Sequence, residues 1–179
     1  MVVVGEQLLG LNKQFSIVSR ELALPEEDFS LALGLDSVIK RYKPMEGALI
    51  FGQEVPPEAI IEERLQVPYL TIKPSEAVLA CSVESVRMPE GFFGLVQTKG
   101  SLARLFITIT CCDGQVEPGY EGKVTFEIAN LGSNAISIPI RAKIAQMYVL
   151  RCSSRRTPVY RGKYQNAKGP TTALFPTEA

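Results

Sequence analysis

The sequence predicts a mainly β protein, either a sandwich or a barrel, and two observations lead to this fold class. Short apolar or alternating runs recur from residue 69 onward, at a spacing of roughly ten residues and with no helical period between them. Turn residues such as Asp113–Gly114 and Pro118–Gly119 separate these runs. The length of 179 residues, 46% of them hydrophobic, is sufficient for a single domain with a buried core.

The N-terminal portion of this domain, residues 1–65, has a mixed pattern. Three leucines between residues 6 and 11 predict a short helix, which Gly10 should limit. An acidic turn is expected at residues 24–28, and the apolar run at residues 30–35 predicts the first strand. Two prolines then open an extended, glutamate-rich connection over residues 56–68.

The β core, residues 66–150, is expected to carry the other strands. They are predicted at residues 69–72, 77–83, 94–98, 105–111, 123–128, 135–140 and 144–150. Together with a C-terminal tail, residues 151–179, these portions should form one domain over residues 1–179.

The C-terminal tail differs from the core in its charge. Six Lys and Arg residues and no acidic residue lie between Arg151 and Thr177. Tyr160 and Tyr164 lie among these bases, where they suit stacking or phosphate contact. Two interpretations stay open: a solvated basic tail, or an anion-binding segment that closes over a ligand.

Several classes of site are excluded or weakened by what the sequence lacks. The chain has no histidine, which excludes a Ser-His-Asp triad and any His-ligated zinc. Its four cysteines include no Cys-x-x-Cys pair, so a metal or redox motif is weakly supported. No stretch approaches the roughly 18 apolar residues of a membrane span, and no basic region precedes an apolar run at the start. We therefore expect a cytoplasmic protein with reduced thiols, no zinc and no membrane partner.

Glu127 is the first candidate for chemistry. Alternation along residues 123–128 places Thr125 and Glu127 on one face of a strand, with Val124 and Phe126 on the other. Glu127 is either a solvated charge on an outer face or, where that face is covered, a desolvated carboxylate that shuttles protons near neutral pH.

Two turns and one strand supply further polar candidates. The segment from Lys99 to Arg104 offers backbone N–H groups, a hydroxyl and positive charge for an anion. Residues 113–122 form either a plain hairpin connection or one wall of a pocket. Gln146 interrupts an apolar strand, so it either bridges buried groups or contacts a ligand.

Taken in order, five segments resemble the dCTP deaminase and dUTPase superfamily. They are residues 98–105, 114–122, 124–127, 141–147 and 160–170, and the similarity extends from about residue 69 to residue 170. The tail, with Lys163-Tyr164-Gln165 before Gly169-Pro170, resembles the deaminase branch. The turn at residues 114–117 is dUTPase-like, and residues 141–147 resemble the fourth dUTPase motif, which gives the mixture that bifunctional deaminase–diphosphatases also show.

The resemblance implies a distorted, jelly-roll-like β-barrel that assembles as a homotrimer, with active sites between subunits and Mg²⁺ on the substrate triphosphate. It implies that Glu127 is the general acid/base and that Arg104 organises the catalytic site. The substrate-binding residues implied are Lys99, Gly100, Ser101, Asp113, Gln115, Glu117, Tyr120, Thr125, Phe126, Gln146, Tyr160, Lys163, Tyr164 and Lys168.

The chain also departs from the family pattern. Gly100 replaces a serine whose hydroxyl supports the reaction, and Lys99 stands where an arginine is usual. Glu117 stands where an aspartate contacts the sugar, and Ala167 replaces a tail glutamine. The run Cys111-Cys112-Asp113 replaces small residues.

These observations predict a nucleotide hydrolase that deaminates dCTP to dUTP in pyrimidine deoxynucleotide metabolism, with continuation to dUMP left open. One alternative is a dUTP diphosphatase without deamination. Another is a non-catalytic regulator that binds a nucleotide such as dCTP, dUTP or dTTP. A nucleic-acid partner for the basic tail is the weakest alternative and is not expected.

Overall fold

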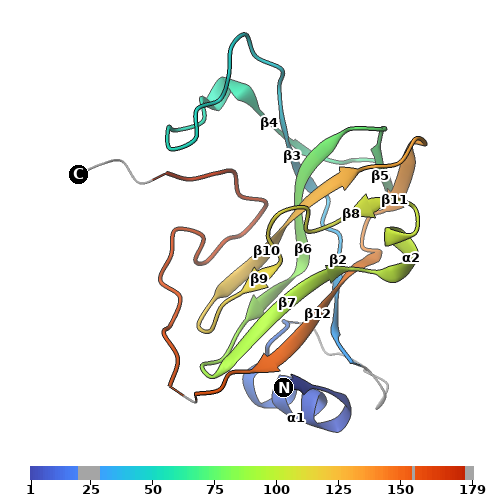
Figure 1. Cartoon of the computed structure of the whole chain (residues 1–179). Coiled ribbons are helices and arrows are strands. Elements are labelled where there is room, and N and C mark those ends of the chain that lie inside the picture. The colour runs from blue at the N-terminus through green and yellow to red at the C-terminus, as the bar shows by residue number, and fades with distance from the viewer. Residues whose placement is uncertain (20–28, 155, 176–179) are drawn as a thin grey trace.

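Two five-stranded antiparallel sheets and a two-stranded ribbon form the framework of the protein. The computed structural model describes residues 1–19, 29–154 and 156–175. The acidic turn expected at residues 24–28 lies outside the described residues. In Figure 1 helix α1 (Gly5–Phe15) lies at one end of the sheets, and the C-terminal tail runs along one side.

The first sheet places the last long strand at its centre. Its members are β1 (Val2–Val3), β12 (Lys143–Arg151), β7 (Phe92–Thr98) and β9 (Gln115–Val116), with β2 (Leu31–Gly34) also paired to β12. The second sheet runs in the order β4 (Ile60–Arg64), β3 (Val38–Tyr42), β6 (Ala77–Arg87), β10 (Glu121–Asn130) and β8 (Ile107–Thr108). Strands β5 (Tyr69–Ile72) and β11 (Ile136–Pro139) form the ribbon, and a short 3-10 turn, η1 (Pro57–Ala59), precedes β4.

The apolar core lies between the two large sheets. One cluster joins Leu33 and Met147 of the first sheet with Ile39 and Phe126 of the second, all with fully buried side chains. Along β10 buried and half-buried residues alternate, so the predicted division of its faces is confirmed. The prediction of a mainly β fold is therefore confirmed as well.

Three expectations about individual elements are wrong. The strand predicted at residues 105–111 shrinks to β8, because α2 (Gly100–Ala103) precedes it and Phe106 turns the chain with a φ of 58°. The glutamate-rich connection contains edge strand β4, four of whose five side chains are exposed, so no alternation marks it. Gly10 does not end α1, which continues to a left-handed Ser16.

An ion pair ties the turn after β2 to the first part of β10. Lys123 Nζ donates to the carboxylate of Asp36, and both side chains are partly buried. The backbone N–H of Ser37 donates to the other carboxylate oxygen at 2.6 Å. Burial alone raises the pKa of Asp36, but the bonds from Lys123 and Ser37 outweigh it and hold the pKa below its usual value. The charged pair therefore stabilises the junction between the sheets.

Replacing Asp36 with asparagine should lower the free energy of unfolding by about 1 kcal/mol near neutral pH, allowing for the partial exposure of the pair. The pKa of Asp36 is lower in the folded protein than in the unfolded chain. The stabilisation by the ion pair is therefore fully present above the unfolded pKa, about 3.9, and is lost as the pH falls below it. Urea unfolding of wild type and Asp36→Asn at pH values of about 7 and 3 should show the difference shrinking in acid.

Glu62→Gln is the matched control, since Glu62 pairs with Lys40 through a carboxylate that is 62% exposed. It should change the free energy of unfolding by less than about 0.5 kcal/mol at either pH. A difference between wild type and Asp36→Asn that grows on acidification would contradict the stabilising role of the pair.

Candidate functional site

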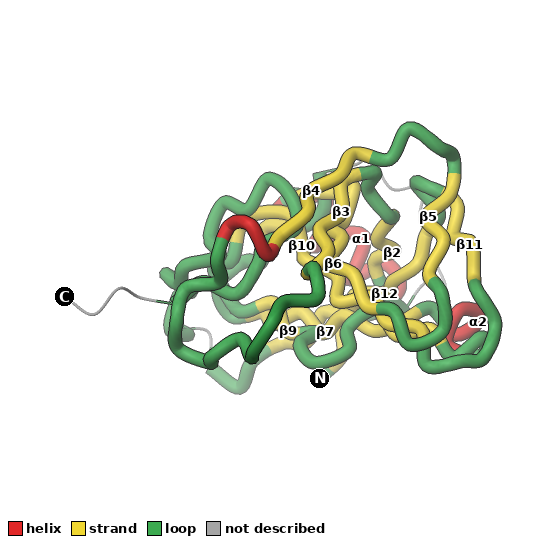
Figure 2. The backbone as a smooth tube through the Cα atoms, turned by 90° about the horizontal axis from the view of Figure 1, so that it is seen from above, coloured by secondary structure: helices red, strands yellow, loops and turns green. Residues whose placement is uncertain are grey.

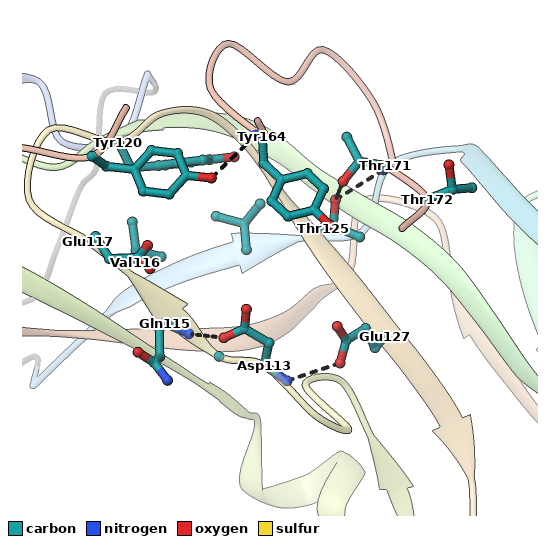
Figure 3. Close-up of a pocket in the computed structure, with 13 residues that line it drawn as sticks. Asp113, Gln115, Val116, Glu117, Tyr120, Thr125, Glu127, Tyr164, Thr171 and Thr172 are labelled. Carbon is teal, nitrogen blue, oxygen red and sulfur yellow. Dashed lines mark hydrogen bonds between the residues drawn. The ribbon is translucent and has the colours of Figure 1, made fainter. Parts of the chain in front are cut away.

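A pocket of about 310 Å³ lies where β9, β10 and the tail meet. This volume is within the range of small-molecule sites. Its lining residues are Asp113, Gly114, Gln115, Val116, Glu117, Tyr120, Val124, Thr125, Glu127, Tyr160, Tyr164, Thr171 and Thr172. Figure 3 shows Asp113 and Glu127 on the opposite side of the pocket from the rings of Tyr120 and Tyr164.

The Glu127 carboxylate is held by the backbone of the loop before β9. Its Oε2 accepts hydrogen bonds from the N–H groups of Cys112, at 2.8 Å, and Asp113, at 3.0 Å. Its own backbone carbonyl accepts from Cys111 N–H at 3.3 Å. Charge-assisted bonds of this kind orient a carboxylate strongly. The half-buried Glu127 carboxylate therefore faces the pocket in a defined position.

The pocket is acidic. Three of its lining residues are the carboxylates Asp113, Glu117 and Glu127, and among the described residues that line it none is Lys or Arg. Asp113 Oδ1 accepts a hydrogen bond from Gln115 N–H at 3.1 Å, which orients the Asp113 side chain at the pocket wall. Such a wall suits amine and hydroxyl groups of a ligand, whereas phosphate groups need cations from elsewhere.

Three tyrosines, Tyr120, Tyr160 and Tyr164, line the pocket. Tyr120 is only 8% exposed and packs edge-on against Tyr160, with ring centroids 5.7 Å apart. Its hydroxyl donates to the backbone carbonyl of Lys123 at 2.6 Å. Burial raises the pKa of Tyr120 well above its usual value, so the hydroxyl stays neutral. The ring is thus a fixed platform for a sugar or base.

The tail follows the side of β10, as Figure 1 shows, and two groups of bonds hold it there. Gln165 Nε2 donates to the carbonyl of Gly119 at 2.9 Å, and its Oε1 accepts from Glu121 N–H at 3.0 Å. Farther along, the Thr171 N–H donates to Thr125 Oγ1 at 3.1 Å. These contacts place Tyr164 and Thr171 at the pocket, consistent with a tail that covers a ligand.

One glycine makes the close approach of the tail possible. Gly122 has a φ of +147°, and a Cβ there would lie 2.7 Å from the backbone nitrogen of Ala167. The two residues form a parallel bridge, with Lys123 N–H donating to the Ala167 carbonyl at 2.8 Å. Glycine at this position therefore permits direct backbone pairing between tail and strand.

The α2 loop does not join this pocket within one chain. Lys99 and Ser101 line a separate cavity beside β11 and β12. Arg104 is exposed, and its Nη1 donates to the carbonyl of Gly100 at 2.9 Å. Figures 1 and 2 show α2 on the opposite side of the molecule from the tail. The proposed organiser Arg104 is thus not beside Glu127 of its own chain.

Four other predicted substrate contacts also lie outside the pocket. Phe126 is fully buried in the core, so its side chain does not reach the pocket, contrary to a side-chain contact with substrate. Gln146 is half-buried and lines a third, open cavity beside Ser30. Lys163 Nζ lies over the ring of Tyr164 at 5.3 Å, and Lys168 is exposed.

The structure adds Gln165, Thr171 and Thr172 to the site. Gln165 anchors the tail, and the two threonines line the pocket. In the sequence Gln165 stands beside Tyr164 in the deaminase-like tail, which is the one signal that marks it. No group of three His, Cys, Asp or Glu side chains within residues 1–19, 29–154 and 156–175 is arranged to hold a metal ion. In the same part of the chain, no helix is long and apolar enough to cross a membrane.

The fold and site together define a two-sheet β protein with an oriented carboxylate in a small-molecule pocket. A solved structure with a similar fold is that of 2'-deoxycytidine 5'-triphosphate deaminase from Agrobacterium tumefaciens, with a TM-score of 0.61 and 15% identity over 83% of this chain and 47% of that one. The dCTP deaminase-like family model matches residues 17–152. The chain belongs to the dCTP deaminase-like family.

Curated relatives match part of the chain. A dUMP-forming dCTP deaminase of Dictyoglomus thermophilum is 33% identical over 118 residues, which is 64% of this chain and 60% of that protein. One from Acidothermus cellulolyticus is 32% identical over 117 residues, or 63% of this chain and 61% of that protein. The matched segment spans less than two thirds of the length of these relatives.

Proposed function

We propose that this protein deaminates dCTP and releases dUMP. The observation that carries the proposal is the Glu127 carboxylate, which two backbone N–H groups hold in the acidic pocket. The two relatives described above are dCTP deaminases that form dUMP. We place the reaction in pyrimidine deoxynucleotide metabolism, with dUTP as the intermediate.

Glu127 acts as the general acid/base in this proposal. It takes a proton from the water that attacks the amine-bearing carbon of cytosine, and it returns protons to the ring and to the departing ammonia. The carboxylate performs this proton transfer itself, so the proposed hydrolysis needs no metal-bound water. Asp113 adds a second carboxylate beside it, which favours the amine of cytosine over the carbonyl of uracil.

The triphosphate is held by cations from outside the acidic pocket. We infer that the protein is a homotrimer in which the α2 loop of a neighbouring subunit, with Lys99 and Arg104, completes each site. The separation of α2 from the pocket within one chain supports this arrangement. Mg²⁺ enters with the nucleotide, whose phosphate oxygens are ligands that it prefers.

The direct test is incubation of the purified protein with dCTP and, separately, with dUTP in the presence of Mg²⁺, followed by ion-exchange separation of the products. Release of ammonia, pyrophosphate and dUMP from dCTP is the expected result. Accumulation of dUTP would show deamination without the second step. Absence of product from dCTP, with the nucleotide still bound, would overturn the proposal in favour of a binding protein.

If each active site combines residues of two subunits, two variants that are inactive alone should regain activity when they assemble together. Glu127→Gln lacks the acid/base and Arg104→Ala lacks the organiser, so each should be nearly inactive alone. If the two residues act from different subunits, random co-assembly should return about a quarter of the sites to the wild-type composition. The measurement is dCTP deamination after the two variants are mixed, unfolded and refolded together. Activity that stays at the level of the separate variants would mean that one chain supplies both residues.

Gln165→Ala should weaken substrate binding by releasing the tail from the turn at Gly119 and Glu121. Two lost hydrogen bonds of about 1 kcal/mol each correspond to a rise in KM of roughly tenfold or more, with kcat less affected. Steady-state kinetics on dCTP measure the effect. Asn166→Gly is the control, because glycine adopts the φ of 61° at this position without strain and keeps the backbone N–H that donates to the Glu121 carbonyl. An equal rise in KM for both variants would contradict an anchoring role of the Gln165 side chain.

A dUTP diphosphatase without deamination is the second candidate. The observation in its favour is that Glu117 lies in the same pocket as Glu127 and offers a carboxylate to activate water at a phosphate. Hydrolysis of dUTP with no release of ammonia from dCTP would select this candidate.

A further inference from the structure

Cys111 and Cys112 are two exposed, adjacent thiols on the loop that contacts Glu127. The neighbouring Cys111 thiol and the charge of Glu127 raise the pKa of Cys112. Cys81, in contrast, is buried, and burial raises its pKa to about 12. Reagents in solution therefore reach the adjacent pair before Cys81.

The backbone of these cysteines is also the support of the catalytic carboxylate. Three successive N–H groups, those of Cys111, Cys112 and Asp113, donate to the carbonyl or carboxylate oxygens of Glu127 at 3.3, 2.8 and 3.0 Å. A change in the backbone dihedrals at residues 111–113 must alter at least one of these bonds. The thiols are thus coupled to the position of Glu127 through the main chain.

Joining the two thiols strains the backbone. Adjacent Cα atoms stay about 3.8 Å apart across a trans peptide, closer than the roughly 4.4–6.8 Å that is usual for disulfides, and rotation about φ or ψ does not change this distance. Closure of the ring must therefore be accommodated by twisting the 111–112 peptide and the dihedrals on either side of it. We propose that Cys111 and Cys112 are a modification site at which a small disulfide oxidant closes a vicinal disulfide and withdraws the backbone donors from Glu127. The effect on turnover rests on the function proposed above, whereas the modification itself does not.

The reaction is a thiol–disulfide exchange that balances in two steps. One cysteine thiolate attacks a sulfur of the oxidant, which forms a mixed disulfide and expels one thiolate. The neighbouring cysteine thiolate then attacks the protein sulfur of this mixed disulfide and expels the second thiolate. Two protein thiols are oxidised to one disulfide, one oxidant disulfide is reduced to two thiols, and the two protons pass to the released thiolates.

Trypsin isolates the site for analysis. Cleavage after Arg104 and Lys123 gives a peptide of residues 105–123, which contains Cys111 and Cys112 but neither Cys81 nor Cys152. The full-length protein is incubated with oxidised glutathione, blocked with iodoacetamide and digested. The expected peptide has lost the mass of two hydrogen atoms and carries no alkyl group. A peptide with two alkylated thiols, with bound glutathione, or linked to another peptide would overturn the proposal.

Two further readouts test the coupling to Glu127. Amide hydrogen exchange of Cys112 and Asp113, followed by NMR, should speed up on oxidation and return after dithiothreitol. The rate of dCTP deamination should fall by at least about tenfold and recover in the same way. If the disulfide closes while hydrogen exchange at both amides stays unchanged, the thiols are not coupled to Glu127. If the reduced protein does not turn over dCTP at all, the proposed function fails, while mass and exchange still decide this proposal.

Two variants serve as controls. The double variant Cys111→Ser/Cys112→Ser keeps the backbone N–H groups but removes both thiols, so oxidised glutathione should no longer change its deamination rate relative to the same variant in reductant. Cys152→Ser removes a thiol outside residues 105–123 and should respond to the oxidant as the wild type does. Sensitivity of the double variant equal to that of the wild type would show that oxidation acts elsewhere.

Discussion

Replacing Glu127 with glutamine should reduce dCTP deamination by about 10²–10⁴-fold or more, which is the usual contribution of a positioned acid/base. The amide cannot accept the proton of the attacking water. Its carbonyl oxygen can still accept both hydrogen bonds that Cys112 and Asp113 donate to Oε2. The loop should therefore keep its place while the chemistry is lost. Ammonia release under steady-state conditions measures the effect.

Glu121→Gln is the matched control for this variant. Glu121 lies on the same strand and makes the same change of charge, but its carboxylate pairs with Arg87 on the surface and does not line the pocket. Its activity should stay within about twofold of wild type, since exposed ion pairs contribute little. Urea unfolding should show both variants within about 1 kcal/mol of wild type. Substantial deamination by Glu127→Gln would remove Glu127 from the mechanism.

Phe126→Ala should lower the free energy of unfolding by about 3–5 kcal/mol, because it opens a cavity in the core between the sheets. Phe126 is 0% exposed and lies one residue before Glu127 on β10. A loss of this size is a large part of the stability of an ordinary domain. Urea unfolding measures the change, and substrate kinetics at low temperature show whether the surviving folded protein still binds dCTP.

Phe51→Ala controls for the same change of side chain at the surface, where Phe51 is 94% exposed and meets Phe175 edge-on. Its unfolding free energy should change by less than about 1 kcal/mol. Comparison of Phe126→Ala with Phe51→Ala also distinguishes a core role of Phe126 from a contact with substrate. A core residue lowers stability with little change in KM, whereas a side-chain contact with substrate, as the sequence resemblance implies, raises KM at unchanged stability.

The alternation of apolar and polar residues along the sequence was the most reliable guide to the fold. Along β10 it identified Phe126 as inward and Glu127 as outward, because each side chain on a pleated strand faces opposite to the next. It failed at β4, whose exposed edge pairs with β3 through backbone bonds that any side-chain pattern permits. It also failed at Phe106, where a residue in the left-handed region turned an apolar run into a loop.

The candidate site was predictable where its residues are close in sequence. Asp113, Glu117, Tyr120, Thr125 and Glu127 come from one continuous hairpin-like stretch, and they meet in the pocket. The contribution of Gln165 was not predictable, because its side chain bonds the backbone of Gly119 and Glu121 rather than any recognisable partner. The three main-chain N–H groups that hold Glu127 were not predictable either, because residue types do not reveal which backbone groups donate.

The sequence by itself determined the mainly β class, the two faces of β10 and the family, since these depend on periodicity and on residue types at fixed spacing. Only the tertiary structure decided that the tail lies on the pocket, that Arg104 lies away from Glu127 of its own chain, and that Cys111 and Cys112 border the carboxylate. These relations depend on which backbone groups come together when distant segments pack. Backbone donors and acceptors are nearly the same at every residue, so the one-dimensional sequence does not encode which of them pair.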